Sequence, residues 1–464
     1  MALLFVSWLA FLDLARLEEC SASMRRAARR FADDAAHRAG MDAGAYTNMA
    51  ASHAAACVDA RRNALRRGRA LATGSVHSLV VDGAGRVHAF GHGAHGRLGL
   101  GAACTSTCTP RAVHFAVHRR GSPPRFSEGP RRSIGAAVRI AQVAAARRHS
   151  VALAVGGAVF TWGGNARGQL GHSDAYDAVG LADVLEPRRV AHLFCGGARV
   201  VEIACGDDHT LLLDSNGRLR ACGAADVVGV EEEGVDVHVP TLLWRLADKR
   251  IRVARIAACG SHSLALTDAG AIYSWGHGAG GRLGHGDDVP RGTPSRVRAL
   301  EGVRVMLIDC GAECSCAIAV DRLWWWGVEN ALSYLSDFDD ADARWRTPTP
   351  CALPKGEVSA LSAGGGLAAA VVIAHGAAHQ LYRDAAGLLR HRPVHLAGDA
   401  VVSAACSDEH YLVLTAAGAV YSAGNGGHGR LGHGSHTSTS APQKLHALSG
   451  PSGTVRWDAI FRDR

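Results

Sequence analysis

One repeated string constrains the fold of this chain more than any other feature. A short apolar stretch ends in an aromatic or small residue and glycine, and Gly-x-Leu-Gly follows a few residues later. The four Gly-x-Leu-Gly copies occupy residues 96–99, 168–171, 281–284 and 429–432. A string that recurs along a chain indicates that one small structural unit is built several times, so the repeat decides the architecture before any local motif does.

A second signature precedes each copy, in which small residues lead to a histidine and then to an apolar strand. These histidines are His77, His149, His262 and His410. Between the two signatures, a turn with glycine comes before a β-rich stretch. This order is typical of a hairpin, because glycine accepts the positive φ that a tight turn requires. A polar loop with proline and an extended segment follow, so one unit is predicted to be a small antiparallel sheet.

Three weaker copies align with this unit, around residues 205–209, 310–327 and 362–382. They bring the total to seven units, spaced by about 43 to 72 residues, near the period of propeller blades. Short Gly-rich and Val-rich strands without long helical periodicity argue against a helical solenoid. The predicted fold is an all-β, seven-bladed β-propeller over residues 70–464, with the segment 454–461 supplying the inner strand of the first blade.

The strings His-Ser-Leu-Ala-Leu from His262, Tyr-Ser-Trp-Gly from Tyr273 and Gly-x-Leu-Gly resemble the regulator of chromosome condensation family of seven-bladed β-propellers. The resemblance covers about residues 70 to 464. Blades three, five and six depart from the pattern: Gly223 is not followed by Gly-x-Leu-Gly, and Cys314 and Leu367 stand where the repeat histidine is expected. These departures leave open whether the three blades are intact.

The repeat residues themselves are interpreted as structural. Five copies of the histidine, including His209, favour an imidazole that bonds the backbone of a neighbouring strand over a catalytic pair with the following Ser or Thr. Trp162, Trp275 and Trp326 share one repeat position and are expected to point inward. No triad, paired carboxylates or Walker string is present, so no covalent chemistry is expected.

Several apparent ligand sites are interpreted as parts of the repeat. Glycine strings such as Gly91-x-Gly93-x-x-Gly96 recur and run into Leu-Gly instead of opening a helix, which argues against nucleotide binding. The cysteines that share one repeat position are predicted to be small core side chains: Cys205, Cys259, Cys310 and Cys406. A zinc site at Cys310, Cys314 and Cys316, or at the predicted loop residues Cys104 and Cys108, lacks a matching second pair. No cofactor or metal is expected.

Residues 1–69 form a separate, basic and Ala-rich extension that is predicted to be helical. Its arginines and those of residues 119–132 give much of the net charge of +8. This positive charge permits an acidic partner such as chromatin, an acidic protein or anionic lipid; alternatively, the charged side chains are solvated and bind no specific partner. The apolar run of residues 1–12 is too short to span a bilayer. A cytoplasmic or nuclear location is expected over secretion or organelle import.

The expected function is non-enzymatic: a protein–protein interaction propeller that acts as a regulatory or scaffold module through its loops. The resemblance implies an alternative, because founding members of the family exchange guanine nucleotide on the small GTPase Ran and dock on chromatin. In the family, an Asp before a repeat histidine contributes to exchange, and Asp208-His209 matches that pair. The predicted partner is a protein, and under the alternative function this partner is a small GTPase.

Two further features are candidates for partner binding. Trp325 falls where Thr161 and Ser274 stand, on the strand face opposite Trp326. Two interpretations follow: an indole packed between neighbouring blades, or an exposed indole that acts as an interface anchor. Four carboxylates just downstream resemble half a calcium loop without its Gly and Glu, and they are interpreted as a solvated acidic insert that would steer a basic partner. These are Asp337, Asp339, Asp340 and Asp342.

Overall fold

A computed structural model describes the repeat region of the chain. The described residues are 69–115, 138–172, 182–191, 193, 198–231, 234–249, 251–319, 322–327, 345–351, 358–364, 370–383, 389–396 and 400–448. The chain divides into two compact units at Arg66 and Arg67. The predicted helical extension and the proposed closing segment 454–461 both lie outside the described residues. None of the described helices has the length and apolarity to cross a membrane.

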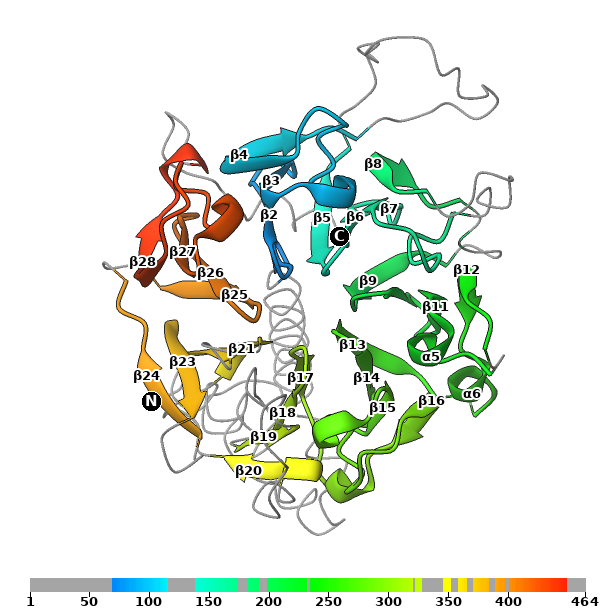
Figure 1. Cartoon of the computed structure of the whole chain (residues 1–464). Helices are drawn as coiled ribbons and strands as arrows, with labels where there is room; N and C mark the ends of the chain where they lie inside the picture. The colour runs from blue at the N-terminus through cyan, green and yellow to red at the C-terminus, as the bar shows by residue number, and fades with distance from the viewer. Residues whose placement is uncertain are drawn as a thin grey trace, which may run out of the picture. The chain divides into compact units, whose positions relative to one another are not determined.

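The second unit is built from seven four-stranded antiparallel sheets, as the repeat predicts (Figure 1). Blade 1 contains β1 (Leu71–Thr73), β2 (His77–Val81), β3 (Val87–His92) and β4 (Ser106–Val113). Blade 2 contains β5 (Ile140–Ala145), β6 (His149–Ala154), β7 (Val159–Gly163) and β8 (Val184–Arg189). Blade 3 contains β9 (Val200–Cys205), β10 (His209–Asp214), β11 (Leu219–Gly223) and β12 (Val237–Leu242). Blade 4 contains β13 (Val253–Cys259), β14 (His262–Thr267), β15 (Ile272–Gly276) and β16 (Arg291–Arg296).

The remaining blades have the same order of strands. Blade 5 contains β17 (Leu307–Cys310), β18 (Ser315–Ala319), β19 (Arg322–Trp326) and β20 (Thr349–Cys351). Blade 6 contains β21 (Val358–Ala363), β22 (Ala370–Ala374), β23 (Ala377–Arg383) and β24 (Leu389–Pro393). Blade 7 contains β25 (Val401–Cys406), β26 (His410–Thr415), β27 (Val420–Gly424) and β28 (Thr439–Lys444). Blades three, five and six therefore keep all four strands despite their departures in sequence.

The blades pack face to face, and the core lies between them. One buried cluster joins Leu211 and Leu213 of blade 3 to Ile256 and Trp275 of blade 4. The next joins blade 4 to blade 5 in the same way. Both faces of the inner three strands are therefore covered, and Trp162, Trp275 and Trp326 are fully buried as predicted. Prolines occur on the outermost strands, where no further strand requires their missing N–H.

Closure of the ring differs from the prediction. The inner strand of blade 1 is β1, which pairs with β2 in the register Leu71↔Val80, so this position is not left for residues 454–461. No strand is exchanged between blades among the described residues, and every sheet consists of consecutive strands. The first and last blades are joined instead by the same side-chain contacts that join other neighbours.

These contacts centre on a hydroxyl held between two groups of the preceding blade. Ser150 of blade 2 lies 2.8 Å from His77 Nε2 and donates to the carbonyl oxygen of Arg97 at 2.8 Å. Because the hydroxyl donates to the carbonyl, its oxygen accepts from the Nε2–H of the histidine. We call this arrangement the interblade clasp. The imidazole thus bonds a side-chain hydroxyl of the next blade, a partner that the sequence prediction of a backbone bond did not include.

The clasp recurs around the ring. His149 Nε2 lies 2.9 Å from Thr210 Oγ1 in blade 3, and His262 Nε2 lies 2.8 Å from Ser315 Oγ in blade 5. Between blades 3 and 4, the distance from His209 Nε2 to Ser263 Oγ is 2.7 Å. The closing contact is equivalent: Ser78 Oγ lies 2.8 Å from His410 Nε2 and donates to the carbonyl oxygen of Arg430 at 2.9 Å.

The last glycine of Gly-x-Leu-Gly forms a second part of the junctions that follow the four blades with this motif. Gly99 has φ +69°, and a Cβ there would lie 2.8 Å from the indole nitrogen of Trp162 in the next blade. A Cβ at Gly284 would likewise lie against the ring of Trp326, and a Cβ at Gly432 against the ring of Phe90. Glycine is required because its φ is left-handed and because a side chain would displace the aromatic ring.

Blade 3 makes this contact without the motif. Where Gly-x-Leu-Gly is expected, a short helix α5 (Ala225–Val228) ends at Gly229, which has φ +86°. A Cβ at Gly229 would lie 2.5 Å from the indole nitrogen of Trp275 in blade 4. The helix therefore presents a glycine to the next aromatic residue as the motif does elsewhere.

The buried histidines predict loss of stability in acid. Burial lowers the pKa of His149 to about 3 and that of His410 to about 3, whereas an unfolded histidine titrates near 6.5. Below about pH 6.5 the unfolded chain binds more protons than the folded one, so the free energy of unfolding falls as pH falls. His149→Gln keeps an N–H for Thr210 but removes one titrating group. Its free energy of unfolding, measured by denaturant unfolding at several pH values, is expected to fall less steeply in acid, by about 1.4 kcal/mol per pH unit. Parallel curves for the variant and the parent would contradict this.

Candidate interaction face

The loops between the first and second strands of the blades form a candidate interaction face. Five of these loops precede a clasp histidine, and since all sheets share one strand order, the loops gather at one end of the axis. We call this the loop end. The other end, with the turns between second and third strands, is called the hairpin end.

The loop end carries charges of both signs from different blades. Blade 2 contributes the exposed Arg147 and Arg148. Acidic residues come from blades 3, 5 and 7: Asp207, Asp208, Glu313, Asp408 and Glu409. No group of three or more His, Cys, Asp or Glu side chains within the described ranges is arranged to hold a metal ion.

Two of these carboxylates are perturbed by their surroundings. Burial raises the pKa of Asp408 to about 6, and the negative charges of Asp207, Glu313 and Glu409 add to the shift. The pKa of Asp207 is also raised, mainly by burial, although Arg147 opposes the shift. Carboxylates of blades 3, 5 and 7 therefore converge at the loop end, and their mutual repulsion favours a cationic partner.

Arginines of the repeat motif hold the loops in place. Arg97 Nη1 donates to the carbonyl oxygen of Arg147 at 2.7 Å, and Arg282 Nη1 to that of Ala312 at 3.1 Å. Arg430 Nη1 donates to the carbonyl oxygen of Ser75 at 2.9 Å. Each guanidinium thus reaches the loop of the next blade, so the position of the loop end is set by the interblade junction.

Asp208 and His209 lie in different environments in the structure. His209 is fully buried in the clasp, and burial lowers the pKa of its imidazole to about 4. Asp208 is half-buried in the loop, and its carbonyl oxygen accepts from Ala224 N at 2.9 Å. Only Asp208 is therefore presented at the loop end, and its part in nucleotide exchange stays a prediction.

Of the two interpretations of Trp325, packing between blades is correct and the exposed interface anchor is wrong. Its side chain has no exposed surface, and Trp325 pairs with Cys316 on one side and Thr349 on the other. The equivalent Ser274 is also buried and donates to the carbonyl oxygen of Leu283 at 2.7 Å within its own blade. The polar face is polar because of this internal bond, not because of solvent, and in blade 5 an indole fills the same space.

The other predicted features either belong to the repeat or lie outside the described residues. The acidic residues Asp337, Asp339, Asp340 and Asp342 lie outside the described residues. The first glycine string contains a single 3-10 turn, η1 (Ala94–Gly96). Cys205, Cys310 and Cys406 are buried as predicted and Cys259 is partly buried, whereas Cys108 lies in strand β4 and not in a loop. Burial raises the pKa of Cys205 and Cys310, which keeps these thiols protonated.

A polar network along the axis was missed in the sequence. Arg69, just before β1, accepts a bond from Val143 N through its carbonyl oxygen at 3.0 Å. Its guanidinium donates to the carbonyl oxygens of Ile203 and, at 2.6 Å, Ile256, and pairs with Glu202 at 2.6 Å. One residue thus connects the inner strands of blades 2, 3 and 4. Only the run of arginines before residue 70 signals it, and such a run does not distinguish a buried arginine from a solvated one.

A family model for the RCC1-like domain matches residues 69–370, which is more than half of the chain. Models for the regulator of chromosome condensation (RCC1) repeat match residues 401–430 and 417–457. The chain belongs to the RCC1-like family. The seven blades, the clasp and the repeated aromatic residue are therefore features of an RCC1-like propeller.

Individual relatives agree with this assignment. The chain is 28% identical to human E3 ubiquitin-protein ligase HERC2 over 397 residues, which are 82% of this chain and 6% of HERC2. It is 29% identical to the ultraviolet-B receptor UVR8 of Arabidopsis thaliana over 311 residues, 66% of this chain and 58% of UVR8. It thus spans less than two thirds of either relative. The structure of Prp20p from Saccharomyces cerevisiae matches with a TM-score of 0.60 at 21% identity, covering 83% of this chain and 89% of Prp20p. At this identity the likeness shows the fold.

Removing the buried charge of Asp408 is expected to stabilise the propeller at neutral pH. Its pKa is raised to about 6 in the folded state, so the contribution of this group to stability is greatest in acid and is lost as pH rises through about 6. Asp408→Asn should raise the free energy of unfolding near pH 7.5 by on the order of 2 kcal/mol, and the gain should vanish near pH 4. Melting curves across this range, with the exposed Asp268→Asn as control, measure it. A gain that persists unchanged at pH 4 would contradict the assignment.

Trp325→Ser is expected to destabilise the fold. Replacing a fully buried large aromatic leaves a cavity, and such losses amount to about 3–5 kcal/mol. The matched control is Trp244→Ser, because Trp244 is 64% exposed and surface substitutions change stability by about 0.5 kcal/mol or less. Denaturant unfolding of both variants tests the burial of Trp325. Equal midpoints for the two variants would show that Trp325 is not a core residue.

Proposed function

We propose that this chain is a non-enzymatic protein-interaction propeller that binds a regulatory partner at its loop end. The observation that carries the proposal is the use of the repeat histidines. All five are buried, and each bonds a hydroxyl of the next blade, so their chemistry is committed to the frame. What the frame offers to a partner is the set of loop residues that precede these histidines.

The charge of the loop end supports a protein partner with a basic segment. Three blades contribute acidic residues there, and blade 2 contributes two exposed arginines. Such an uneven distribution of charge fixes the orientation of a docked protein, because like charges placed together are costly. Relatives agree in kind: the solved structure of Prp20p is described together with its binding properties to Gsp1p and histones.

The alternative is exchange of guanine nucleotide on a Ran-like small GTPase. It is supported by Asp208, which is half-buried at the loop end and belongs to the acidic group of blade 3. The binding of Prp20p to Gsp1p also supports it, since that relative shares the fold of this chain. The two functions differ in one measurable respect: a binding module leaves the rate of nucleotide release unchanged.

The proposal is tested by affinity capture with variants of the loop end. The double variant Arg148→Glu with Asp208→Lys reverses two charges on loops of blades 2 and 3, and the control Glu186→Lys reverses one exposed charge on the outer strand β8. We expect the loop variant to lose its specific partners at least about tenfold while its melting temperature stays near that of the parent. Equal recovery by both variants would contradict binding at the loop end.

A nucleotide-release assay separates the alternative. The purified chain is mixed with a Ran-like GTPase that carries a fluorescent nucleotide, and the release rate is measured with and without Asp208→Ala. The proposal predicts no acceleration by either protein. Acceleration by the parent that Asp208→Ala slows would replace the proposed function with exchange.

A further inference from the structure

The hairpin end carries a repeated arginine, whereas the loop end carries charges of both signs. In blades 2 to 5 an exposed arginine stands shortly before the inner strand. These residues are Arg139, Arg199, Arg252 and Arg304. Because they share one repeat position, neighbouring blades place the same cation along an arc at this end.

Each of these arginines is held by the preceding blade. A Cβ at Gly217, in the turn of blade 3, would lie 3.2 Å from the Cβ of Arg252. A Cβ at Gly157 would lie 2.8 Å from the Cβ of Arg199. The stem of the side chain therefore packs on a glycine turn, which limits its freedom and lowers the entropy lost when the guanidinium binds.

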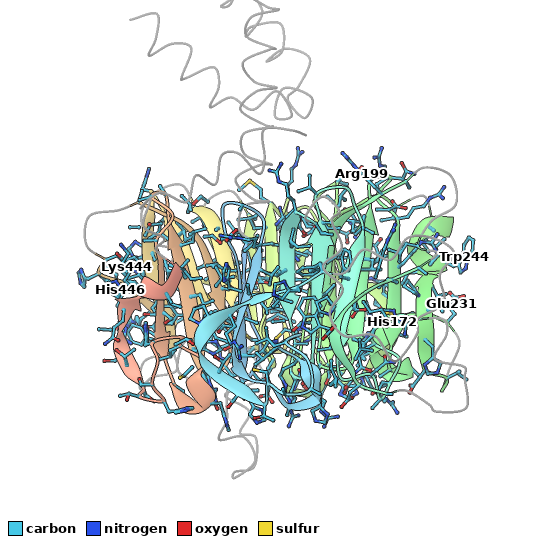
Figure 2. The ribbon with its side chains drawn as sticks, turned by 90° about the horizontal axis from the view of Figure 1, so that it is seen from above. His172, Arg199, Glu231, Trp244, Lys444 and His446 are labelled. Carbon is cyan, nitrogen blue, oxygen red and sulfur yellow. The ribbon has the colours of Figure 1, made fainter. Side chains whose placement is uncertain are left out.

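An exposed tryptophan lies beside this arc. Trp244 begins helix α6 (Trp244–Asp248), which connects β12 to β13, and it is 64% exposed. Figure 2 shows Trp244 at the outer edge, in the same half of the molecule as Arg199. The helix itself is anchored, since Leu246 is buried against the core of blades 3 and 4 and Arg245 Nη1 donates to Thr293 Oγ1 at 2.9 Å. The indole is thus exposed on a fixed support.

The surroundings of Trp244 are basic. Arg218 in the turn of blade 3, Lys249 after α6 and Arg252 are all exposed. The nearby Asp214 is buried and accepts from Asn216 N and Arg218 N, so its charge is used inside the turn. On the blade 4 side the exposed Asp268 follows Thr267, and its amide bonds the carbonyl oxygen of Arg252 at 3.1 Å. Leu243 N donates to the carbonyl oxygen of Leu219, and the turn at Gly217 packs on Arg252, so the three cations lie on segments that adjoin Trp244.

We propose that Trp244, Arg218, Lys249 and Arg252 form a docking surface for an acidic protein segment that carries an apolar side chain. The apolar residue would pack on the indole, and Asp or Glu side chains would accept from the guanidinium groups, which match carboxylates in geometry. The proposal rests on the proposed function that the propeller binds proteins, and it adds a second site at the opposite end.

The composition of the surface favours protein over nucleic acid. Tryptophan and arginine are enriched in the cores of protein interfaces and lysine is depleted, whereas a phosphate backbone is bound by lysine and arginine alike. Among the described residues of this surface, two are arginine, one is lysine and one is tryptophan. Hot spots in protein interfaces are likewise rich in Trp and Arg.

The test uses the full chain and a fluorescein-labelled peptide of alternating Glu and Asp with one central Leu, followed by fluorescence anisotropy. Trp244→Ser and Arg252→Glu should each weaken binding by about tenfold or more, since truncating a hot-spot residue commonly has an effect of this size. The same peptide with Leu replaced by Ser should bind the parent weakly and should not respond to Trp244→Ser. Binding should also weaken as salt is raised.

Matched controls separate this surface from general charge and apolarity. Val289→Ser removes an exposed apolar side chain of blade 4, and Arg111→Glu reverses an exposed arginine on the outer strand of blade 1. Both should bind the peptide as the parent does. Equal loss in the controls would overturn the proposal, and so would a single-stranded oligonucleotide that binds more tightly and with the same dependence on Trp244 and Arg252. The loop variant Arg148→Glu with Asp208→Lys should still bind the peptide, so failure at one end is distinguishable from failure at the other.

Discussion

The rest of this structure depends on a hydroxyl group clasped between two groups of the preceding blade. In the contact of blade 1 with blade 2, Ser150 accepts from His77 and donates to the carbonyl oxygen of Arg97, so both of its hydrogen-bonding functions are satisfied inside the core. A buried imidazole can remain there only if it is neutral, and burial lowers the pKa of His77 far enough to ensure this. The same bonds that join the blades thus prevent the histidines from serving as acids or bases at neutral pH.

The clasp also accounts for the departures in blades 5 and 6, because the histidine and the hydroxyl of one junction are lost together. Blade 5 carries Cys314 in place of histidine, and the sequence of blade 6 has Ala368 where a hydroxyl would be needed. Blade 6 carries Leu367, and blade 7 has the buried Tyr411 at the hydroxyl position. An unpaired buried hydroxyl or imidazole would cost more than losing both partners. The junction between blades 5 and 6 retains a weaker bond, from Cys314 Sγ to the carbonyl oxygen of Gly364 at 3.3 Å.

The sequence predicted those features that recur at one repeat position. The seven blades are confirmed, and Trp275 and the five repeat histidines are buried, because the same junction recurs in successive blades. The exposure of Trp325 was mispredicted, because strand alternation describes a sheet with one open face and here both faces are covered by neighbouring blades. The contact that Gly229 makes with the next blade was not predicted from the motif. In blade 3 the helix α5 replaces Gly-x-Leu-Gly, which keeps the glycine contact but not the string. Arg69 has no repeat equivalent in the described residues, so no periodicity pointed to it.

A frame held by identical junctions leaves its two ends independent of each other. The loop end is fixed by arginines that reach into the next loop, and there burial and the repulsion among carboxylates of blades 3, 5 and 7 raise the pKa of Asp408 to about 6. The hairpin end is fixed by glycine turns that pack on arginine stems, and its charges are mostly positive around Trp244. The second strand of each blade, such as β10 (His209–Asp214), runs from one end to the other. At about 3.3 Å per residue, such a strand is long enough that a ligand at one end does not touch the other. Opposite charge at opposite ends of a rigid support therefore favours two partners of different chemistry bound at once, which is the arrangement that a scaffold requires.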